Sequence, residues 1–301
     1  MSITAEWIAV DWGTTHLRAW AMSGRDVLAE ASSDQGMGRL AKDAFEPALV
    51  ELVNGWLSQG RVTEVICCGM VGSRQGWCEA TYRAVPCRVD GFQPVLAPVH
   101  EPRLRVHVLP GLSQSSPPDV MRGEETQIAG FLALNDGWDG VICLPGTHSK
   151  WVHISAGEVV SFQTFLTGEM FSLLAQASVL RHSIAPDGWD AAVFDAAVSD
   201  AMSRPESLAA RLFRLRAADL LNGTEPVAAR AELSGLLIGA ELAAARPYWL
   251  GQQVAVIGAD AVASAYVAAL AAQGVGATQA KAEAMTLSGL TAAYRALETT
   301  I

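Results

Sequence analysis

Short apolar runs separated by turns dominate the first part of the chain, and they predict strands. Residues 7–10 form a continuous apolar run, a turn with glycine and threonine follows, and apolar residues return at 17–22. Runs of this length between turn residues are typical of buried strands. Because a third strand is predicted over 26–32, the chain begins with an antiparallel meander.

The same alternation of strands and turns occurs again in the middle of the chain. Apolar strands are predicted over 140–144, 151–154 and 158–165, and the first turn is again rich in glycine and hydroxyl residues. Gly146-Thr147 therefore occupies the position that Gly13-Thr14 occupies in the first unit. The shared flanking pattern favours a duplicated domain over coincidence.

Helical periodicity, with apolar residues every three or four positions, dominates the remaining sequence. The predicted helices cover 44–59, 125–134, 168–182, 190–202, 207–221, 229–246, 261–273 and 285–297. Further strands are predicted at 64–68 and 106–109, and near 253–260, where the strand enters a small-residue turn. A Ser- and Pro-rich stretch at 113–118 has the composition of a linker. Strands that alternate with helices indicate an α/β fold.

The composition limits the size of the protein and its partners. Half of the 301 residues are apolar and 17% are charged, which suits two globular domains with sizeable cores. A formal net charge of −10 without basic clusters argues against nucleic-acid and anionic-membrane partners. No signal-peptide pattern begins the sequence, and the five cysteines lack metal-site spacing. These features predict a cytoplasmic protein with buried thiols.

The turn after the first strand is a candidate phosphate site. Its residues are Asp11, Gly13, Thr14 and Thr15. Backbone amides and hydroxyls could face a phosphate there, while the carboxylate of Asp11 holds a cation. The alternative is an ordinary hairpin, because aspartate and glycine are common turn residues.

Three further features could hold a ligand. A glycine-rich loop at 69–77 carries Arg74 and Trp77; its alternative is a surface loop in which Trp77 caps the core. Glu124 lies near the first turn of the helix predicted over 125–134, where acidic residues also stabilise the helix terminus. The turn at Gly258-Ala259 would let a flat ring approach the backbone, or simply join a strand to a helix.

Together and in this order, these motifs resemble the phosphate-1, phosphate-2 and adenosine elements of the actin-like ATPase superfamily, which includes glycerol kinase and hexokinase. More specifically, the chain is similar to the 2-dehydro-3-deoxygalactonokinase (2-keto-3-deoxygalactonate kinase) family. The segments that carry this similarity are residues 10–15, 69–77, 121–127, 144–151 and 167–171.

The resemblance implies an α/β fold in which two ribonuclease H-like domains flank an interdomain cleft. The N-terminal domain would cover residues 1–110 together with the C-terminal helix at 285–301, and it would bind the sugar and the first phosphate element. The nucleotide-binding domain would cover residues 111–284. Such a kinase would need ATP and Mg²⁺ as cofactors.

Roles for individual residues also follow from the resemblance. Asp11 would hold Mg²⁺, and Glu124 would be the general base, with Glu125 as the open alternative. The nucleotide phosphates, ribose and base would meet Gly13, Thr14, Thr15, Gly146, Thr147, Ser149, Lys150, Gly258 and Ala259. The carboxylate of the substrate needs a cation, for which Arg74 is favoured over Arg18 and Arg122, and Trp77 would lie near the substrate.

The implied reaction is ATP-dependent phosphorylation of the C6 hydroxyl of 2-dehydro-3-deoxy-D-galactonate in D-galactonate catabolism. One alternative is a kinase of the same fold that acts on another sugar acid or a neutral sugar. The other is a sugar-sensing switch that hydrolyses ATP slowly, which the Gly123-Glu124 step disfavours. The preferred epimer, the preferred metal and the assembly state stay open, with a homodimer among the possible assemblies.

Overall fold

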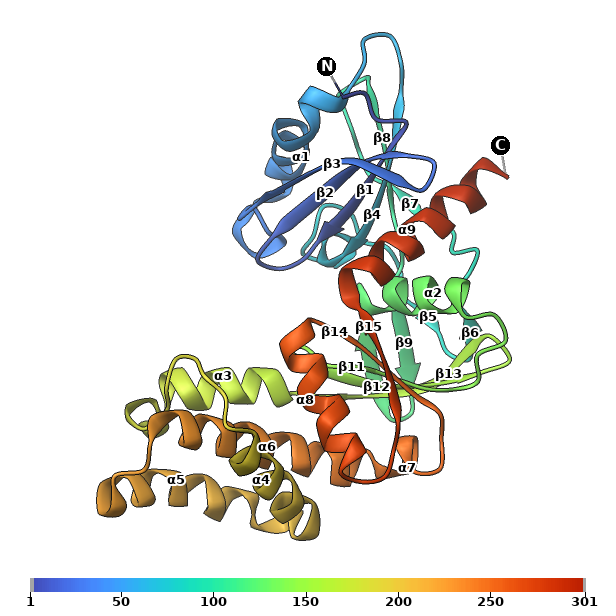
Figure 1. Cartoon of the computed structure of the whole chain (residues 1–301). Helices are drawn as coiled ribbons and strands as arrows, with labels where there is room; N and C mark the ends of the chain where they lie inside the picture. Colours follow the sequence, from blue (N-terminus) through green and yellow to red (C-terminus); the bar gives the residue numbers. More distant parts are fainter. Residues whose placement is uncertain (1–2, 300–301) are drawn as a thin grey trace. The chain divides into compact units, whose positions relative to one another are not determined.

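The computed structural model describes residues 3–299, which divide into two compact units (Figure 1). Unit 1 comprises 3–138, 155–161 and 282–299, and unit 2 comprises 139–154 and 162–281. Residues 300–301, with which the predicted C-terminal helix ends, lie outside the described part.

The sheet of unit 1 contains the predicted meander at one edge. Its strands are β1 (Trp7–Trp12), β2 (Leu17–Ser23), β3 (Asp26–Ser33), β4 (Thr63–Gly69), β7 (Val95–Leu96) and β8 (Leu104–Val108). They are arranged in the order β3-β2-β1-β4-β8-β7. The β1–β2 and β2–β3 pairs are antiparallel, whereas β4 pairs in parallel with both β1 and β8. The apolar runs of β1 and β4 are almost completely buried, as their composition predicts.

The second sheet repeats this arrangement. Its strands include β11 (Gly140–Leu144), β12 (Ser149–Ser155), β13 (Glu158–Phe165), β14 (Val254–Gly258) and β15 (Ala277–Lys281). The order β13-β12-β11-β14-β15 matches β3-β2-β1-β4-β8, with an antiparallel β11–β12 pair and parallel partners beyond β11. The topology confirms the predicted duplication. At its first residues, β13 also pairs with β6 (Cys87–Arg88).

A small third sheet corrects the expectation of a linker at 113–118. It consists of β5 (Arg83–Ala84), β9 (Leu112–Ser115) and β10 (Pro118–Met121) in the order β10-β9-β5. Ser115 pairs with Pro118 across a two-residue turn, so the Ser- and Pro-rich stretch is the tip of a hairpin. Leu112 and Met121 are buried at its base and anchor the hairpin.

Unit 1 has three helices: α1 (Phe45–Val53), α2 (Glu124–Leu134) and α9 (Ala282–Glu298). α2 and α9 lie side by side (Figure 1). A Cβ at Gly130 would overlap the carbonyl oxygen of Met285, and one at Gly289 would overlap that of Thr126. This packing of backbone on backbone groups residues 111–138 with unit 1, whereas the division expected from the sequence placed them in the C-terminal domain.

The remaining helices belong to unit 2. They are α3 (Thr167–Ala177), α4 (Ala191–Ser203), α5 (Leu208–Asn222), α6 (Pro226–Ala244), α7 (Arg246–Trp249) and α8 (Asp260–Ala271). Figure 1 shows α4, α5 and α6 as one helical layer, in which α6 packs against both of the others. Short 3₁₀ turns occur at 37–39, 42–44, 54–56, 70–72, 179–182 and 205–207. Across residues 3–299, none of the helices has the length and apolar character that crossing a membrane requires.

Candidate active site

Two glycines bring the start of α2 close to the first hairpin. Gly69, at the end of β4, has a φ of +92°, and a Cβ there would lie 2.8 Å from the carbonyl oxygen of Trp12 and 3.4 Å from Oδ1 of Asp11. Gly123, just before α2, has a φ of +107°, and its Cβ would lie 3.4 Å from the Cα of Gly69. Side chains at either position would be strained or crowded. Glycine is therefore required where Asp11 and the start of α2 approach each other.

Asp11 lies at the end of β1, opposite Arg18 on β2. Nη2 of Arg18 donates a hydrogen bond of 2.5 Å to Oδ2 of Asp11, and Nη1 of Arg18 lies 3.6 Å from a carboxylate oxygen of Glu283 on α9. The thiol of Cys68 lies 3.9 Å from Oδ1 of Asp11. The structure thus places Arg18 beside two carboxylates, while its predicted role in binding the substrate stays a prediction.

The turn after β1 is held by backbone hydrogen bonds from a segment that the sequence did not single out as part of the site. The N–H groups of Gly36, Met37 and Gly38 donate to the carbonyl oxygens at positions 15, 13 and 14 respectively. Thr14 and Thr15 are both exposed. The turn is consequently fixed through its backbone, and its two hydroxyl side chains stay accessible to a ligand.

The two glutamates that begin α2 have different surroundings. Glu124 is half-buried, and its Oε2 accepts a hydrogen bond of 3.1 Å from the backbone N–H of Arg122. Glu125 is completely buried, and its Oε2 accepts a 2.7 Å bond from the N–H of Gly123. Both therefore also stabilise the helix start, as the alternative interpretation of Glu124 expects. Because only Glu124 reaches the surface, only Glu124 can touch a substrate in this conformation.

Burial and the neighbouring charge of Glu124 raise the pKa of Glu125 to about 8. Glu125 is therefore expected to make stability depend on pH. Between its unfolded pKa near 4.5 and its folded pKa near 8, the folded protein holds a proton that the unfolded chain has lost. The free energy of unfolding should then fall as the pH rises through this range, by on the order of 4 kcal/mol.

Glu125→Gln tests this expectation, because an amide cannot ionise and its oxygen can still accept the Gly123 bond. Urea unfolding at about pH 5 and about pH 9 should show the variant gaining stability relative to the wild type at the higher pH. A difference between the two proteins that stays constant with pH would contradict the assignment.

The candidate substrate side chains differ in their exposure. Arg74 is exposed on the glycine-rich loop. Trp77 is only 5% exposed and packs against Phe45 and Trp12, with ring centroids 6.2 and 6.1 Å away. Arg122 is buried as well; its Nη2 donates to the carbonyl oxygen of Ala80. Arg74 is the candidate of these three that a solvent-borne carboxylate can reach.

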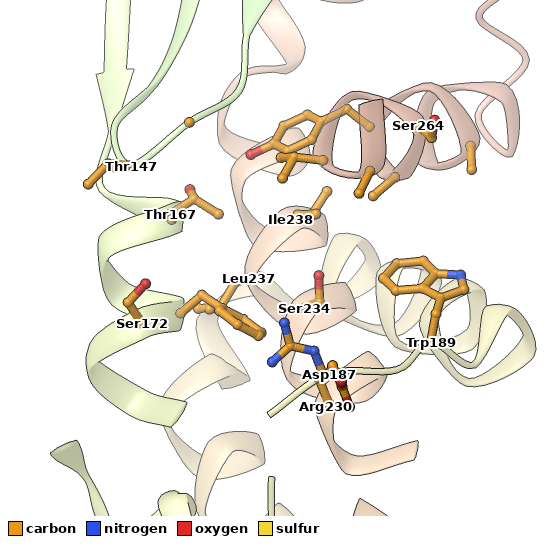
Figure 2. Close-up of a pocket in the computed structure, with 18 of the residues that line it drawn as sticks. Thr147, Thr167, Ser172, Asp187, Trp189, Arg230, Ser234, Leu237, Ile238 and Ser264 are labelled. Atoms are coloured by element: carbon orange, nitrogen blue, oxygen red, sulfur yellow. The ribbon is translucent and has the colours of Figure 1, made fainter. Parts of the chain in front are cut away.

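Unit 2 contains a cavity of about 1000 Å³. Figure 2 shows Thr147 and Thr167 on one side of it and Trp189 on the other, with Arg230 and Asp187 between the helices below. The walls come from the β11–β12 turn, α3, the loop before α4, α6 and α8. The phenyl ring of Phe171 lies 4.9 Å from the guanidinium carbon of Arg230.

The predicted nucleotide residues of unit 2 fall into two groups. Gly146 and Thr147 line the cavity, and Gly258-Ala259 leads directly into α8, which forms one wall. Ser149 and Lys150 are buried: the hydroxyl of Ser149 lies 2.9 Å from the phenol of Tyr266. The sequence did not identify Trp189 or Arg230, because a lone aromatic or arginine in a helical region has no spacing pattern that marks a ligand site.

Comparison with known proteins decides the family. The model of the 2-keto-3-deoxy-galactonokinase family matches residues 11–293. The chain belongs to this family. It is 38% identical to a probable 2-dehydro-3-deoxygalactonokinase of Rhizobium meliloti (strain 1021), over 99% of both chains. It is 36% identical to the 2-dehydro-3-deoxygalactonokinase of Escherichia coli (strain K12), over 90% of this chain and 91% of that one.

A solved structure supports the same assignment. The crystal structure of a protein assigned as a 2-dehydro-3-deoxygalactonokinase from Sinorhizobium meliloti has a TM-score of 0.90 to this chain at 38% identity. The similarity covers 97% of this chain and 99% of that one. The resemblance to the 2-dehydro-3-deoxygalactonokinase family that was drawn from the sequence motifs is therefore confirmed, and the repeated strand order of the two sheets agrees with the expected pair of related α/β domains.

Proposed function

We propose that the protein transfers the γ-phosphate of ATP to the C6 hydroxyl of 2-dehydro-3-deoxy-D-galactonate, in the cytoplasm and as a step of D-galactonate catabolism. Family membership supports the reaction class, and ATP is the phosphate donor expected of such a kinase. The observation that carries the proposal is the approach of α2 to the first hairpin, which places the half-buried Glu124 on the unit that carries Asp11.

Glu124 is the proposed general base. Phosphoryl transfer needs alignment and neutralisation of charge, together with a group that accepts the proton of the attacking hydroxyl. A carboxylate at the start of a helix fulfils the last requirement when it can reach the substrate. The buried Glu125 is proposed as a structural neighbour that holds the start of α2 through its hydrogen bond from the N–H of Gly123.

Asp11 is the proposed ligand of Mg²⁺. Mg²⁺ in kinases is typically held by one or two carboxylates together with phosphate oxygens and water, so a single partly exposed carboxylate fits the ion. Within residues 3–299, no group of three or more His, Cys, Asp or Glu side chains is arranged to hold a metal ion. When bound, the ion would neutralise phosphate charge. In the structure, the guanidinium of Arg18 lies beside the carboxylates of both Asp11 and Glu283.

The cavity of unit 2 is the proposed nucleotide site. Thr147 and Gly146 would donate a hydroxyl and an amide to the phosphates, and the aromatic and apolar walls formed by Phe171 and Trp189 suit a purine. A volume of about 1000 Å³ is sufficient for a nucleoside triphosphate. Ser149 and Lys150 are buried and do not line the cavity, so they would support its wall from behind and would not contact the phosphates directly.

Arg74 is the proposed partner of the substrate carboxylate. Its guanidinium is exposed, whereas Arg18 is paired with Asp11 and Arg122 is buried under Tyr82. A planar guanidinium binds a carboxylate through two parallel hydrogen bonds. A neutral sugar could take hydrogen bonds from Arg74 but could not form the ion pair, so replacing Arg74 should weaken binding of a sugar acid more than binding of a neutral sugar.

A coupled assay of ADP release tests the proposed reaction. Purified protein with Mg²⁺ and ATP is offered 2-dehydro-3-deoxy-D-galactonate, other 2-keto-3-deoxy acids and neutral sugars, and the product is identified by mass and NMR. We expect turnover with the galactonate-derived acid and phosphate at C6. Turnover of a neutral sugar without turnover of this acid would exclude the proposal, and ATP hydrolysis without any acceptor would favour the switch.

Trp189→Ala tests the nucleotide site. Stacking of a base on an aromatic ring contributes about 1–3 kcal/mol, so the KM for ATP should rise by about tenfold or more, while the KM for the sugar acid stays unchanged. Phe213→Ala is the matched control, because Phe213 is an exposed aromatic of unit 2 that does not line the cavity. An unchanged KM for ATP in Trp189→Ala would place the base elsewhere.

A further inference from the structure

One buried carboxylate has no part in the roles described so far. Glu241 lies on α6 and is 3% exposed. Its Oε1 accepts a hydrogen bond of 2.8 Å from the indole N–H of Trp151. Its Oε2 accepts a bond of 2.7 Å from the phenol of Tyr266 and another from the hydroxyl of Thr167. Three donors from three elements therefore converge on one carboxylate.

These donors come from the elements that form the proposed nucleotide site. Trp151 lies on β12, Thr167 is the first residue of α3, and Tyr266 lies on α8. Thr167 and Tyr266 also line the cavity, where Figure 2 shows Thr167 beside Thr147. Because Glu241 itself does not line the cavity, it touches the walls of the site from behind.

Thr167 is coupled to the phosphate-facing turn through the backbone. Two residues further along α3, the N–H of Glu169 donates a bond of 2.8 Å to the carbonyl oxygen of Thr147. Between them, Gly168 approaches Gly146 so closely that a Cβ would overlap the carbonyl oxygen of Gly146. A displacement of Thr167 would consequently move the turn that carries Gly146 and Thr147.

Burying the carboxylate of Glu241 costs free energy of folding, and this cost needs an explanation beyond the filling of space. Burial opposes the charged form and raises the pKa of Glu241, while the hydrogen bonds from Thr167, Tyr266 and Trp151 lower it. An apolar side chain of similar volume would avoid this cost in a site that only had to be filled. The hydrogen bonds instead fix the orientations of Thr167, Tyr266 and Trp151, because each of these side chains has to point its donor at the carboxylate of Glu241.

We propose that Glu241 is a positioning residue: by binding Thr167, Tyr266 and Trp151 together, it holds the Gly146-Thr147 turn in the geometry that receives the nucleotide phosphates. This inference rests on the proposed nucleotide site in unit 2. Glu241 does not touch the nucleotide, and it acts through α3, α8 and β12.

Glu241→Gln is the central test, since it keeps the shape and removes the charge. One of the two oxygens becomes an NH₂ group, which faces a donor and cannot accept its bond. We expect the KM for ATP and the dissociation constant of Mg-ADP, measured by calorimetry, to rise by about tenfold. The KM for the sugar acid should stay within about twofold, because the substrate is assigned to unit 1.

Two partner variants keep the test informative if Glu241→Gln folds poorly. Tyr266→Phe and Thr167→Val each remove one hydroxyl that binds Glu241. Each should weaken Mg-ADP binding by a few fold, and combining either one with Glu241→Gln should add less than the sum of the separate effects. Glu232→Gln is the matched control: it is the same substitution on the same helix, at a half-buried residue that does not line the cavity.

The outcomes separate this inference from the proposed nucleotide site. If Trp189→Ala weakens ATP binding but Glu241→Gln and both partner variants leave it unchanged, the positioning role is overturned and the nucleotide site stands. A lower melting temperature with unchanged Mg-ADP binding overturns the positioning role in the same way, because it describes a purely structural residue. If Trp189→Ala has no effect either, the nucleotide site itself fails, and the inference fails with it.

Discussion

Replacing the proposed base, Glu124→Gln, is expected to lower kcat by about three orders of magnitude while the KM for each substrate changes little. A positioned general base contributes about 10²–10⁴ in rate, and glutamine cannot accept the proton of the attacking hydroxyl. The amide oxygen can still accept the bond from the N–H of Arg122, so the helix start should keep its shape. Steady-state kinetics with both substrates measures the effect.

Glu125→Gln is the matched control for that experiment. It is the same substitution at the next residue, whose side chain is completely buried and already accepts the bond from Gly123. We expect it to retain a large part of the wild-type kcat. If Glu124→Gln kept its full rate and Glu125→Gln lost it, the two assignments would have to be exchanged.

The second large effect is expected at the α2–α9 contact. Gly289→Ala would place a methyl group on the carbonyl oxygen of Thr126, and neither helix can yield locally because the contact is backbone on backbone. Overpacking of this kind costs about 3 kcal/mol of unfolding free energy, and more where the backbone must move. Urea unfolding should reveal the loss, and kcat should fall too, because α2 carries Glu124.

Gly55→Ala provides the control for this prediction. Nothing lies within 4 Å of a Cβ at Gly55, and its backbone has no positive φ. Alanine there should leave stability unchanged or raise it slightly, since it restricts the unfolded chain. Equal losses of stability in the two variants would show that the helix contact is not the cause.

The sequence predicts the strands of both sheets well where they are buried. β1, β4, β11 and β14 each contain a continuous apolar run of four or more residues between turn residues, a pattern typical of buried strands. The pattern does not predict β15, because Ala277–Lys281 is partly exposed and has no apolar run. Its pairing with β14 is a tertiary contact that no local pattern reveals.

From the sequence alone, only those residues of the candidate site can be predicted whose residue types form a recognisable motif. The turn at Gly13-Thr14, its repeat at Gly146-Thr147 and the step at Glu124 are visible in the sequence because glycine, hydroxyl and carboxylate residues occur at matching places. The site residues that depend on packing are not visible there. Glu241 resembles any glutamate in an alanine-rich helix until its three donors are seen around it.

The burial of Ser149 and Trp77 is another feature that the sequence alone does not reveal. The sequence indicates that Ser149 lies beside the turn at Gly146-Thr147, but not that the alternation of side chains along β12 points it inwards to Tyr266. Likewise, a tryptophan after a glycine-rich loop can face a ligand or the core. In the structure it packs with Trp12 and Phe45, an outcome that depends on residues far away in the chain.

The pairing of α2 with α9 also makes the order of protein synthesis matter. α2 is synthesised well before α9, which follows every other helix and strand of the described chain. Until α9 emerges, the surface of α2 around Gly130 has no partner, and the helix that presents Glu124 is not held against the sheet of unit 1. During synthesis, the residues that line the proposed nucleotide site of unit 2 therefore precede α9, the helix on which the placement of the proposed base depends.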